Sequence, residues 1–192
     1  FGLTPREHFK GLRTLLPELK GLAILDNDGL SRQDSDEGAL RIRYWRRYEA
    51  ENYFITPELL RDYAYRQYPA DDLFTQHARD EVDQALAETL RDEVFGGSQA
   101  DYDTWATSPT DAARLIWEAR TERRKLSTLA ESFFRRLAQR LGGAMLLRKG
   151  ELHRLIPHAQ LSAAAESEVR AKLDLLQRLF EQARSHDEIE RT

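Results

Sequence analysis

The sequence contains no cysteine, a single methionine and no apolar run long enough to cross a lipid bilayer. The absence of cysteine excludes disulfide bonds, zinc sites built on thiolates and cysteine nucleophiles. A membrane-spanning helix needs about 20 consecutive apolar residues, so no membrane partner is expected. A cytoplasmic location is the simplest expectation from these absences.

Motifs that bind nucleotides or carry a nucleophile are also missing. There is no Gly-rich Walker A loop, no Rossmann glycine fingerprint and no Gly-x-Ser-x-Gly elbow. The chain is therefore not expected to hold ATP itself or to act as a nucleophilic hydrolase. The histidines match no zinc-binding spacing; they are His8, His77, His153, His158 and His186.

The composition is that of a folded protein. The 192 residues are 41% hydrophobic and 32% charged, which suits one sizeable domain or two small ones. A net charge of −4 gives no global preference for nucleic acid. Arginine is nevertheless clustered within 41–47 and within 120–148. Such clusters bind phosphate backbones or form solvated helix faces, and both interpretations stay open.

The hydrophobic pattern of the first 56 residues predicts a helix and two strands. Thr4-Pro5 is typical of a helix start, and this helix is expected to end near Leu16. The apolar run 22–25 predicts a buried strand of a parallel sheet, followed by a loop. Alternating apolar and basic residues over 40–46 predict a second, half-buried strand.

A helical period dominates from Thr56-Pro57 onward. It predicts helices over 73–95, over 112–141 with possible breaks, and over 162–184, with a loop over 98–107. The predicted fold class is therefore α/β and rich in helix, with a partial parallel sheet followed by a mainly helical region. The predicted divisions are an α/β portion (1–56), a helical region packed on it (57–184) and a frayed tail (185–192).

Two aspartates, Asp26 and Asp28, follow the first predicted strand directly. Carboxylates at the carboxyl end of a buried strand can hold Mg²⁺, which prefers oxygen ligands and keeps several waters. The alternative is a simple turn, because Asp-Asn-Asp-Gly is also a favourable turn sequence. The pair is thus a candidate metal site.

Glu49 and Glu51 follow the second predicted strand, and Lys149 follows a short apolar segment further along the chain. The two glutamates are candidates to complete a cation site with Asp26 and Asp28, or are surface charges paired with neighbouring arginines. Lys149, beside a glycine, is a candidate to neutralise charge that develops on a phosphate.

The order of these features resembles a known family. Asp26-x-Asp28-Gly29 after an apolar strand, then Glu49-x-Glu51-Asn52-Tyr53-Phe54 before a Pro57 helix, and lastly Lys149-Gly150-Glu151-Leu152, resemble the Toprim-like C-terminal region of OLD-family (overcoming lysogenisation defect) ATPases. The resemblance is closest over 18–60. Proteins of this family join an ABC-like ATPase to a metal-dependent nuclease region, and many act in defence against phage.

The resemblance implies a function and a site. It implies a divalent-metal-dependent DNA endonuclease region in antiviral defence, controlled by an ATPase. Asp26, Asp28, Glu49 and Glu51 would bind Mg²⁺ or Mn²⁺, and Lys149 would be catalytic. A Toprim site also uses a glutamate on an earlier strand, so that glutamate and the ATP-binding domain are expected in a longer chain, upstream of Phe1. Implied partners are DNA, this ATPase domain and further copies of the chain in a homo-oligomer.

The alternative function is a catalytically degenerate scaffold for dimerisation or partner binding in an ATPase complex. Its predicted interface is apolar and lies on the long helices; it consists of Leu115, Trp117, Leu126, Leu129, Phe133, Phe134 and Leu137. Such aromatic stripes are more often part of a core. A receiver-like or phosphatase-like acid pair would require a second strand-end nucleophile, and the sequence offers none.

Overall fold

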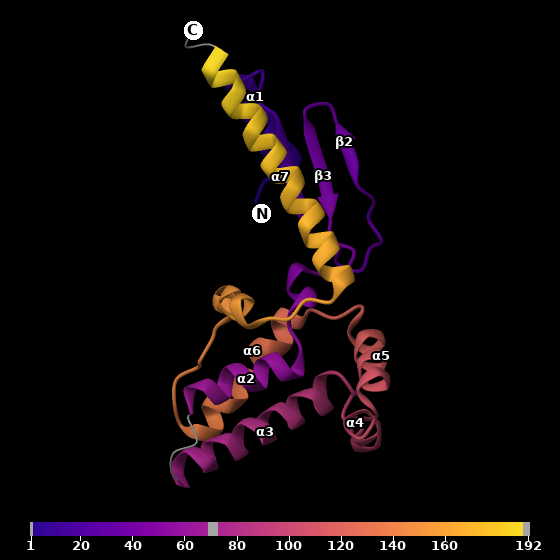
Figure 1. Cartoon of the computed structure of the whole chain (residues 1–192), viewed down its shortest axis with the longest axis vertical. Helices are drawn as coiled ribbons and strands as arrows, with labels where there is room; N and C mark the ends of the chain where they lie inside the picture. The colour runs from indigo at the N-terminus through magenta and orange to yellow at the C-terminus, as the bar shows by residue number, and fades with distance from the viewer. Residues whose placement is uncertain (1, 69–72, 190–192) are drawn as a thin grey trace. The chain divides into compact units, whose positions relative to one another are not determined.

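The computed structural model describes residues 2–68 and 73–189, and Figure 1 shows their arrangement along the chain. The elements in chain order are α1 (Pro5–Leu15), β1 (Gly21–Leu25), β2 (Ser35–Glu37), β3 (Leu40–Tyr44), the 3₁₀ helix η1 (Ala50–Tyr53), α2 (Pro57–Gln67), α3 (Leu73–Glu93), α4 (Gln99–Ala106), α5 (Thr110–Thr121), α6 (Leu126–Leu141), the 3₁₀ helix η2 (Lys149–His158) and α7 (Ala163–Ile189). Helix predominates and the sheet is small, which confirms the predicted helix-rich α/β class.

The chain forms two compact units. Unit 1 combines residues 1–46 with 161–192, and unit 2 consists of residues 47–160. The boundary drawn from the hydrophobic period lay at residue 56, ten residues into unit 2. That boundary followed the change from strand to helix pattern, whereas the units are defined by packing, which joins the last helix to the first strands.

Unit 1 contains a three-stranded mixed sheet in the order β1-β3-β2. β1 is parallel to β3, with Gly21 opposite Leu40 and Leu25 opposite Tyr44. The predicted parallel pair is therefore present. β2, within the predicted loop, adds an antiparallel strand beside β3. β1 is half-buried along its length, not buried as predicted, because among the described residues it pairs on one side only.

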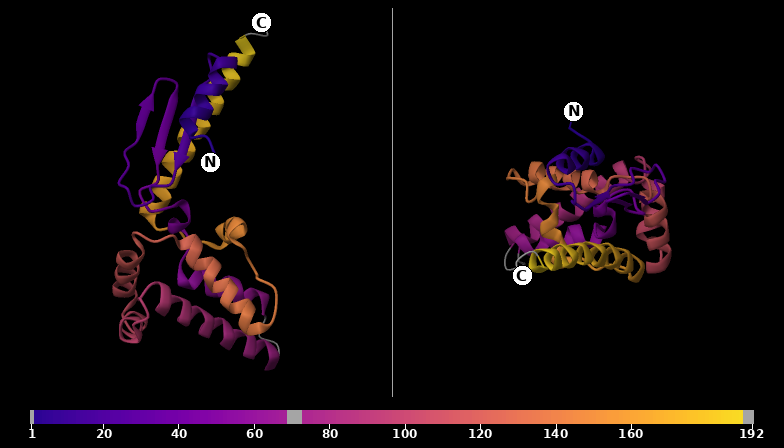
Figure 2. Two further views of the ribbon diagram at one scale, coloured as in Figure 1. Left: turned by 180° about the vertical axis from the view of Figure 1, so that it is seen from behind. Right: turned by 90° about the horizontal axis from the view of Figure 1, so that it is seen from above.

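Helices α1 and α7 both contact the sheet of unit 1. Thr4 caps α1 as predicted, since its hydroxyl accepts a hydrogen bond from the Glu7 N–H. Gly21 permits a close approach of α1: a Cβ at this position would lie 2.7 Å from the Phe9 ring. α7 contacts β1. In the view from above in Figure 2, α1 and α7 lie apart, so they do not pack as a pair.

Unit 2 has a large apolar core built from α2, α3, α5, α6 and η2. Phe133 and Phe134 of α6 are fully buried, with ring centroids 4.9 Å apart. α6 packs along α3 over much of its length. The predicted long helix over 112–141 is interrupted at 122–125, where α5 ends and α6 begins. The predicted loop over 98–107 is wrong, because Ser98 caps a helix there, α4.

The C-terminal helix continues past its predicted end. α7 runs from Ala163 to Ile189, whereas a frayed tail was expected from residue 185. The last three residues of that tail lie outside the described residues. No helix among the described residues is both long and apolar enough to span a membrane.

Candidate functional site

The acidic pair lies in unit 1, directly after β1. Asp26 is exposed and Asp28 is half-buried. Both belong to the loop at the carboxyl end of β1, the strand that runs parallel to β3. Open α/β sheets bind ligands at this end of their parallel strands. The pair therefore occupies the position expected from the sequence, and cation binding by it stays a prediction.

Asn27, between the two aspartates, holds this loop to the end of β3. Its Oδ1 accepts a hydrogen bond from the Arg32 backbone N–H at 3.1 Å, and its Nδ2 donates to the Arg46 carbonyl at 3.4 Å. The chain turns at Asp28 and Gly29, which have φ angles of 52° and 69°. A left-handed aspartate is uncommon and costs about 1–2 kcal/mol. The predicted turn is thus present, and it exposes the Asp26 carboxylate.

A cavity of about 890 Å³ lies beside Asn27, within unit 1. Its walls come from the loop after β1, the end of β3 and the first half of α7. The lining contains more cationic than acidic side chains: Arg32, Arg43, Arg46 and Lys172 against Asp34 and Glu168. A net positive lining at the carboxyl end of parallel strands favours an anionic ligand.

Two of these cations are held by neighbouring acids. The Arg43 guanidinium lies 2.6 Å from Asp36, and this hydrogen bond lowers the pKa of the Asp36 carboxyl. The Lys172 ammonium lies 3.0 Å from Glu168 and 5.0 Å from the centre of the Trp45 ring. Both cations are largely buried, so they are fixed parts of the cavity wall.

Arg32 differs from them. Its side chain is exposed, and its guanidinium lies 5.6 Å from the centre of the Tyr44 ring. Among the described residues no acid forms an ion pair with it. Its backbone N–H donates a hydrogen bond of 3.1 Å to Oδ1 of Asn27, the residue between Asp26 and Asp28. Arg32 is therefore an exposed cation of the cavity lining that no described acid neutralises.

Glu49 lies in unit 2 and is 4% exposed. Its Oε1 accepts a hydrogen bond of 2.7 Å from the Ser127 backbone N–H, in the first turn of α6. The residue at the N-cap position, Lys125, supplies no side-chain cap. A carboxylate at the N-terminal end of a helix accepts a hydrogen bond from a backbone N–H that has no partner within the helix. Its negative charge also interacts favourably with the positive end of the helix dipole. This contact gives Glu49 a structural role. A metal ligand has to be accessible to the ion, whereas the Glu49 carboxylate is buried and already accepts a hydrogen bond.

Asn52 supports the same junction. Its Nδ2 donates to the carbonyls of Thr121 and Arg124 at 3.3 and 3.0 Å, and its Oδ1 accepts from the Leu126 N–H at 3.5 Å. Asn52 thus joins η1 to the end of α5 and the start of α6. No local signal in the sequence indicates this role, because the partners of Asn52 lie about 70 residues away along the chain.

The other two predicted residues are also in unit 2. Glu51 is half-buried within η1, and Lys149 is exposed at the first position of η2. No described acid forms an ion pair with Lys149. The structure therefore brings Asp26 and Asp28 together in one unit, and assigns Glu49, Glu51 and Lys149 to the other unit. Among the described residues no group of three or more histidine, aspartate and glutamate side chains is arranged to hold a metal ion.

Several arginines of the second cluster, within 120–148, form ion pairs inside unit 2. Arg136 lies 3.2 Å from Glu88 and 3.0 Å from Asp92, and Arg140 lies 2.6 Å from Glu81. These acids are on α3. The hydrogen bond that Arg140 donates to Glu81 raises the pKa of the Arg140 guanidinium. These two arginines therefore join α6 to α3 and are already paired with acids of unit 2.

The helical interface of the alternative function consists mostly of core residues. Of the side chains proposed for it, Leu115 is exposed, and the remainder are buried in unit 2. Other apolar side chains are exposed on unit 1. On α1 and α7 they are Leu12, Leu15, Leu173, Leu176 and Phe180.

No protein-family model, curated protein or solved structure matches the chain. The most informative feature of the site, the cationic cavity, was only partly visible in the sequence. Arg32 follows the acidic pair in the chain, whereas Lys172 reaches the cavity only through the packing of α7 on the sheet.

Proposed function

We propose that unit 1 is the Toprim-like, metal- and phosphate-binding part of a divalent-metal-dependent DNA endonuclease that works with an ATPase in anti-phage defence. The observation that carries this proposal is the juxtaposition of Asp26 and Asp28 with a cationic cavity at the carboxyl end of β1. Cation ligands beside phosphate-binding cations are the arrangement that phosphodiester hydrolysis requires. The ATPase and the defence role rest on the family resemblance.

Two of the four predicted metal ligands, Asp26 and Asp28, lie together and fit a divalent cation. Asp26 and Asp28 would hold Mg²⁺ or Mn²⁺, since one or two carboxylates suffice when the ion keeps several waters. When bound, the ion would lower the pKa of a coordinated water and offset negative charge on the phosphate. Arg32 would bind a backbone phosphate, and Lys172 and Arg43 would keep the cavity positive. Glu49 is left out of this site because Ser127 already uses its carboxylate.

Calorimetric titration of the chain with Mn²⁺ tests the acidic pair. Heat of binding is expected for the unaltered chain and is expected to disappear in Asp26→Ala and Asp28→Ala. Asp174→Ala, which removes an exposed aspartate from α7 of the same unit, should bind normally. Absence of binding heat in the unaltered chain would favour the scaffold instead.

Nicking of supercoiled plasmid DNA by the longer chain, in which the upstream glutamate is expected, tests the reaction. With Mn²⁺ present, the activity should be lost in Asp26→Ala and Asp28→Ala and lowered about tenfold in Arg32→Ala, which removes a charge-assisted phosphate contact. Undiminished nicking by both aspartate variants would rule out the proposed site.

A second candidate function is a scaffold for self-association. It is favoured by the exposed apolar stripe on α7, where Leu173, Leu176 and Phe180 recur at helical spacing and are 58%, 37% and 63% exposed. Sedimentation of the chain and of Leu176→Glu over a concentration series tests it. A dimer of the unaltered chain that becomes a monomer in Leu176→Glu would support the scaffold. A monomer of the unaltered chain at all concentrations would exclude it.

A further inference from the structure

Unit 2 contains an aromatic cleft that the proposed nuclease function does not use. It has a volume of about 640 Å³ and lies between α2, α4 and α5. Its aromatic wall is formed by Tyr102, Trp105 and Trp117. The Trp105 ring centre lies 5.8 Å from that of Tyr102 and 6.3 Å from that of Trp117. We call this feature the aromatic cleft.

The aromatic wall is fixed in place. The indole N–H of Trp105 donates a hydrogen bond of 3.0 Å to the Ala113 carbonyl. Trp117 is almost fully buried, whereas Trp105 and Tyr102 are half-buried and line the opening. Rigid aromatic faces of this kind attract cations through the negative charge of their π systems.

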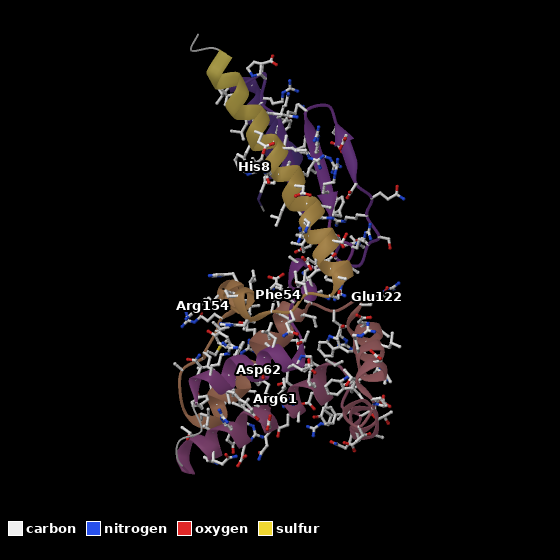
Figure 3. The ribbon with its side chains drawn as sticks, viewed as in Figure 1. His8, Phe54, Arg61, Asp62, Glu122 and Arg154 are labelled. Carbon is white, nitrogen blue, oxygen red and sulfur yellow. The ribbon has the colours of Figure 1, made fainter. Side chains whose placement is uncertain are left out.

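Two acids of α2, Glu58 and Asp62, also line the aromatic cleft; Figure 3 labels Asp62 on that helix. Both side chains are exposed, and no described residue forms an ion pair or a hydrogen bond with either carboxylate. Because they are four residues apart on a helix, they lie about 6 Å apart on one face. They therefore offer two neighbouring negative charges beside the aromatic wall.

The cations of the aromatic cleft are already neutralised. Arg61 lies 3.0 Å from Asp83, which does not line the cleft. Arg114 is flanked by two further acids on its own helix, Asp111 and Glu118, at 3.6 and 3.7 Å. The unpaired charge in the aromatic cleft is thus negative, which disfavours an anion and favours a cation.

We propose that the aromatic cleft binds an extended basic peptide that carries arginine or lysine at alternate positions. Alternate side chains of an extended chain are about 7 Å apart, close to the spacing of Glu58 and Asp62. One cationic group would pair with each carboxylate, and its aliphatic stem would pack on Trp105 and Tyr102. A volume of about 640 Å³ accommodates more than one side chain. The inference concerns unit 2 alone and does not depend on the proposed nuclease site.

Fluorescence titration tests the proposal, because two of the three tryptophans line the aromatic cleft. The remaining one, Trp45, is replaced in a Trp45→Phe background, so that the signal reports on unit 2. The probe is the capped peptide Gly-Arg-Gly-Arg-Gly, and its control is the capped peptide Gly-Gln-Gly-Gln-Gly. We expect a saturable change with the arginine peptide only, which weakens as salt is added.

Charge-neutralising variants locate the binding. Asp62→Asn and Glu58→Gln should each lower the affinity for the arginine peptide by about two- to fivefold, which is the effect of losing one exposed ion pair. Glu122→Gln removes an equally exposed acid of unit 2 outside the aromatic cleft and should have no effect. Calorimetry repeats the titration on the unaltered chain. The proposal is overturned if neither method finds saturable binding, if the glutamine peptide binds equally well, or if Glu122→Gln weakens binding as much as Asp62→Asn.

Discussion

At the residue scale, Glu49 and Asp26 carry the same chemical group in opposite surroundings. Glu49 is buried and accepts a hydrogen bond from the first turn of α6, whereas Asp26 is exposed at the end of β1. A buried carboxylate is stable only where donors satisfy it, so its role is fixed by its partner. An exposed carboxylate is accessible to solvent and to ions.

Removing the Glu49 side chain should destabilise unit 2. Glu49→Ala leaves the Ser127 N–H buried without an acceptor and is expected to lower the free energy of unfolding by about 2–3 kcal/mol. Glu49→Gln keeps an acceptor oxygen and should cost about 1 kcal/mol. Urea denaturation of the three proteins measures the difference. An unchanged denaturation midpoint for Glu49→Ala would contradict the capping role and would make Glu49 a candidate metal ligand again.

Tyr65 should make stability depend on pH in the alkaline range. Burial raises the pKa of its hydroxyl to about 12, helped by a hydrogen bond of 2.6 Å to Asp83. The folded protein therefore retains a proton that the unfolded chain releases near its ordinary pKa of 10.0. This contribution to stability is complete below pH 10 and is lost as the pH rises toward 12.

The measurement for Tyr65 is a set of denaturation midpoints at several alkaline pH values, with Tyr65→Phe as the matched variant. The midpoint of the unaltered chain should fall more steeply above pH 10 than that of the variant. Equal slopes would show that the hydroxyl of Tyr65 titrates alike in the folded and unfolded states.

At the scale of single elements, α6 illustrates how two adjacent glycines can have different importance. Gly142 ends the helix in the left-handed region with φ of 63°, and its N–H donates to the Ala138 carbonyl. Gly143 has no positive φ, and a Cβ at either position would meet nothing within 4 Å. The two positions therefore differ in backbone conformation but not in available space.

Gly142→Ala should destabilise the chain by about 1 kcal/mol, because an alanine in the left-handed region is strained. Gly143→Ala is the matched control and is expected to change the unfolding free energy by less than about 0.5 kcal/mol. Thermal or urea unfolding followed by circular dichroism at the helix band compares them. A similar loss in both variants would point to a steric cause instead of the backbone conformation.

At the scale of the whole molecule, the core is unevenly divided. Most of the buried apolar side chains belong to unit 2, whereas in unit 1 they are Leu40, Ile42 and Ala165. Unit 2 is also one continuous segment, 47–160, between the two segments of unit 1. A continuous segment with its own core is expected to fold independently.

The fragment 47–160 should therefore fold without the rest of the chain. We expect a helical circular dichroism spectrum and a cooperative thermal transition, because the core of α2, α3, α5 and α6 lies entirely within it. In the whole chain, hydrogen exchange should be slower in α3 and α6 than in α1, which has no buried residue. A fragment without a cooperative transition, or equal exchange in α1 and α6, would contradict the independence of unit 2.

Local signals were sufficient for much of the secondary structure. Thr4-Pro5 and Thr56-Pro57 begin helices as predicted, since a hydroxyl cap and a proline act within one turn. A continuous apolar run identified β1, and alternating apolar and basic residues identified β3. The misassigned elements have weak local patterns: β2 is a strand of three polar residues that pairs with the neighbouring β3, and α4 is a short helix whose Trp105 lies beside Trp117 of α5.

The sequence alone determined the starts of α1 and α2, the strand pair, and the position of Asp26 and Asp28 after a strand, because these depend on neighbouring residues. Tertiary packing decided the rest. It brought α7 back to the first strands to form the cationic cavity with Lys172, and it buried Glu49 at the start of α6. Contacts between residues 78 or more positions apart leave no periodic pattern in a single sequence, so only the folded chain separates a buried carboxylate from an exposed one.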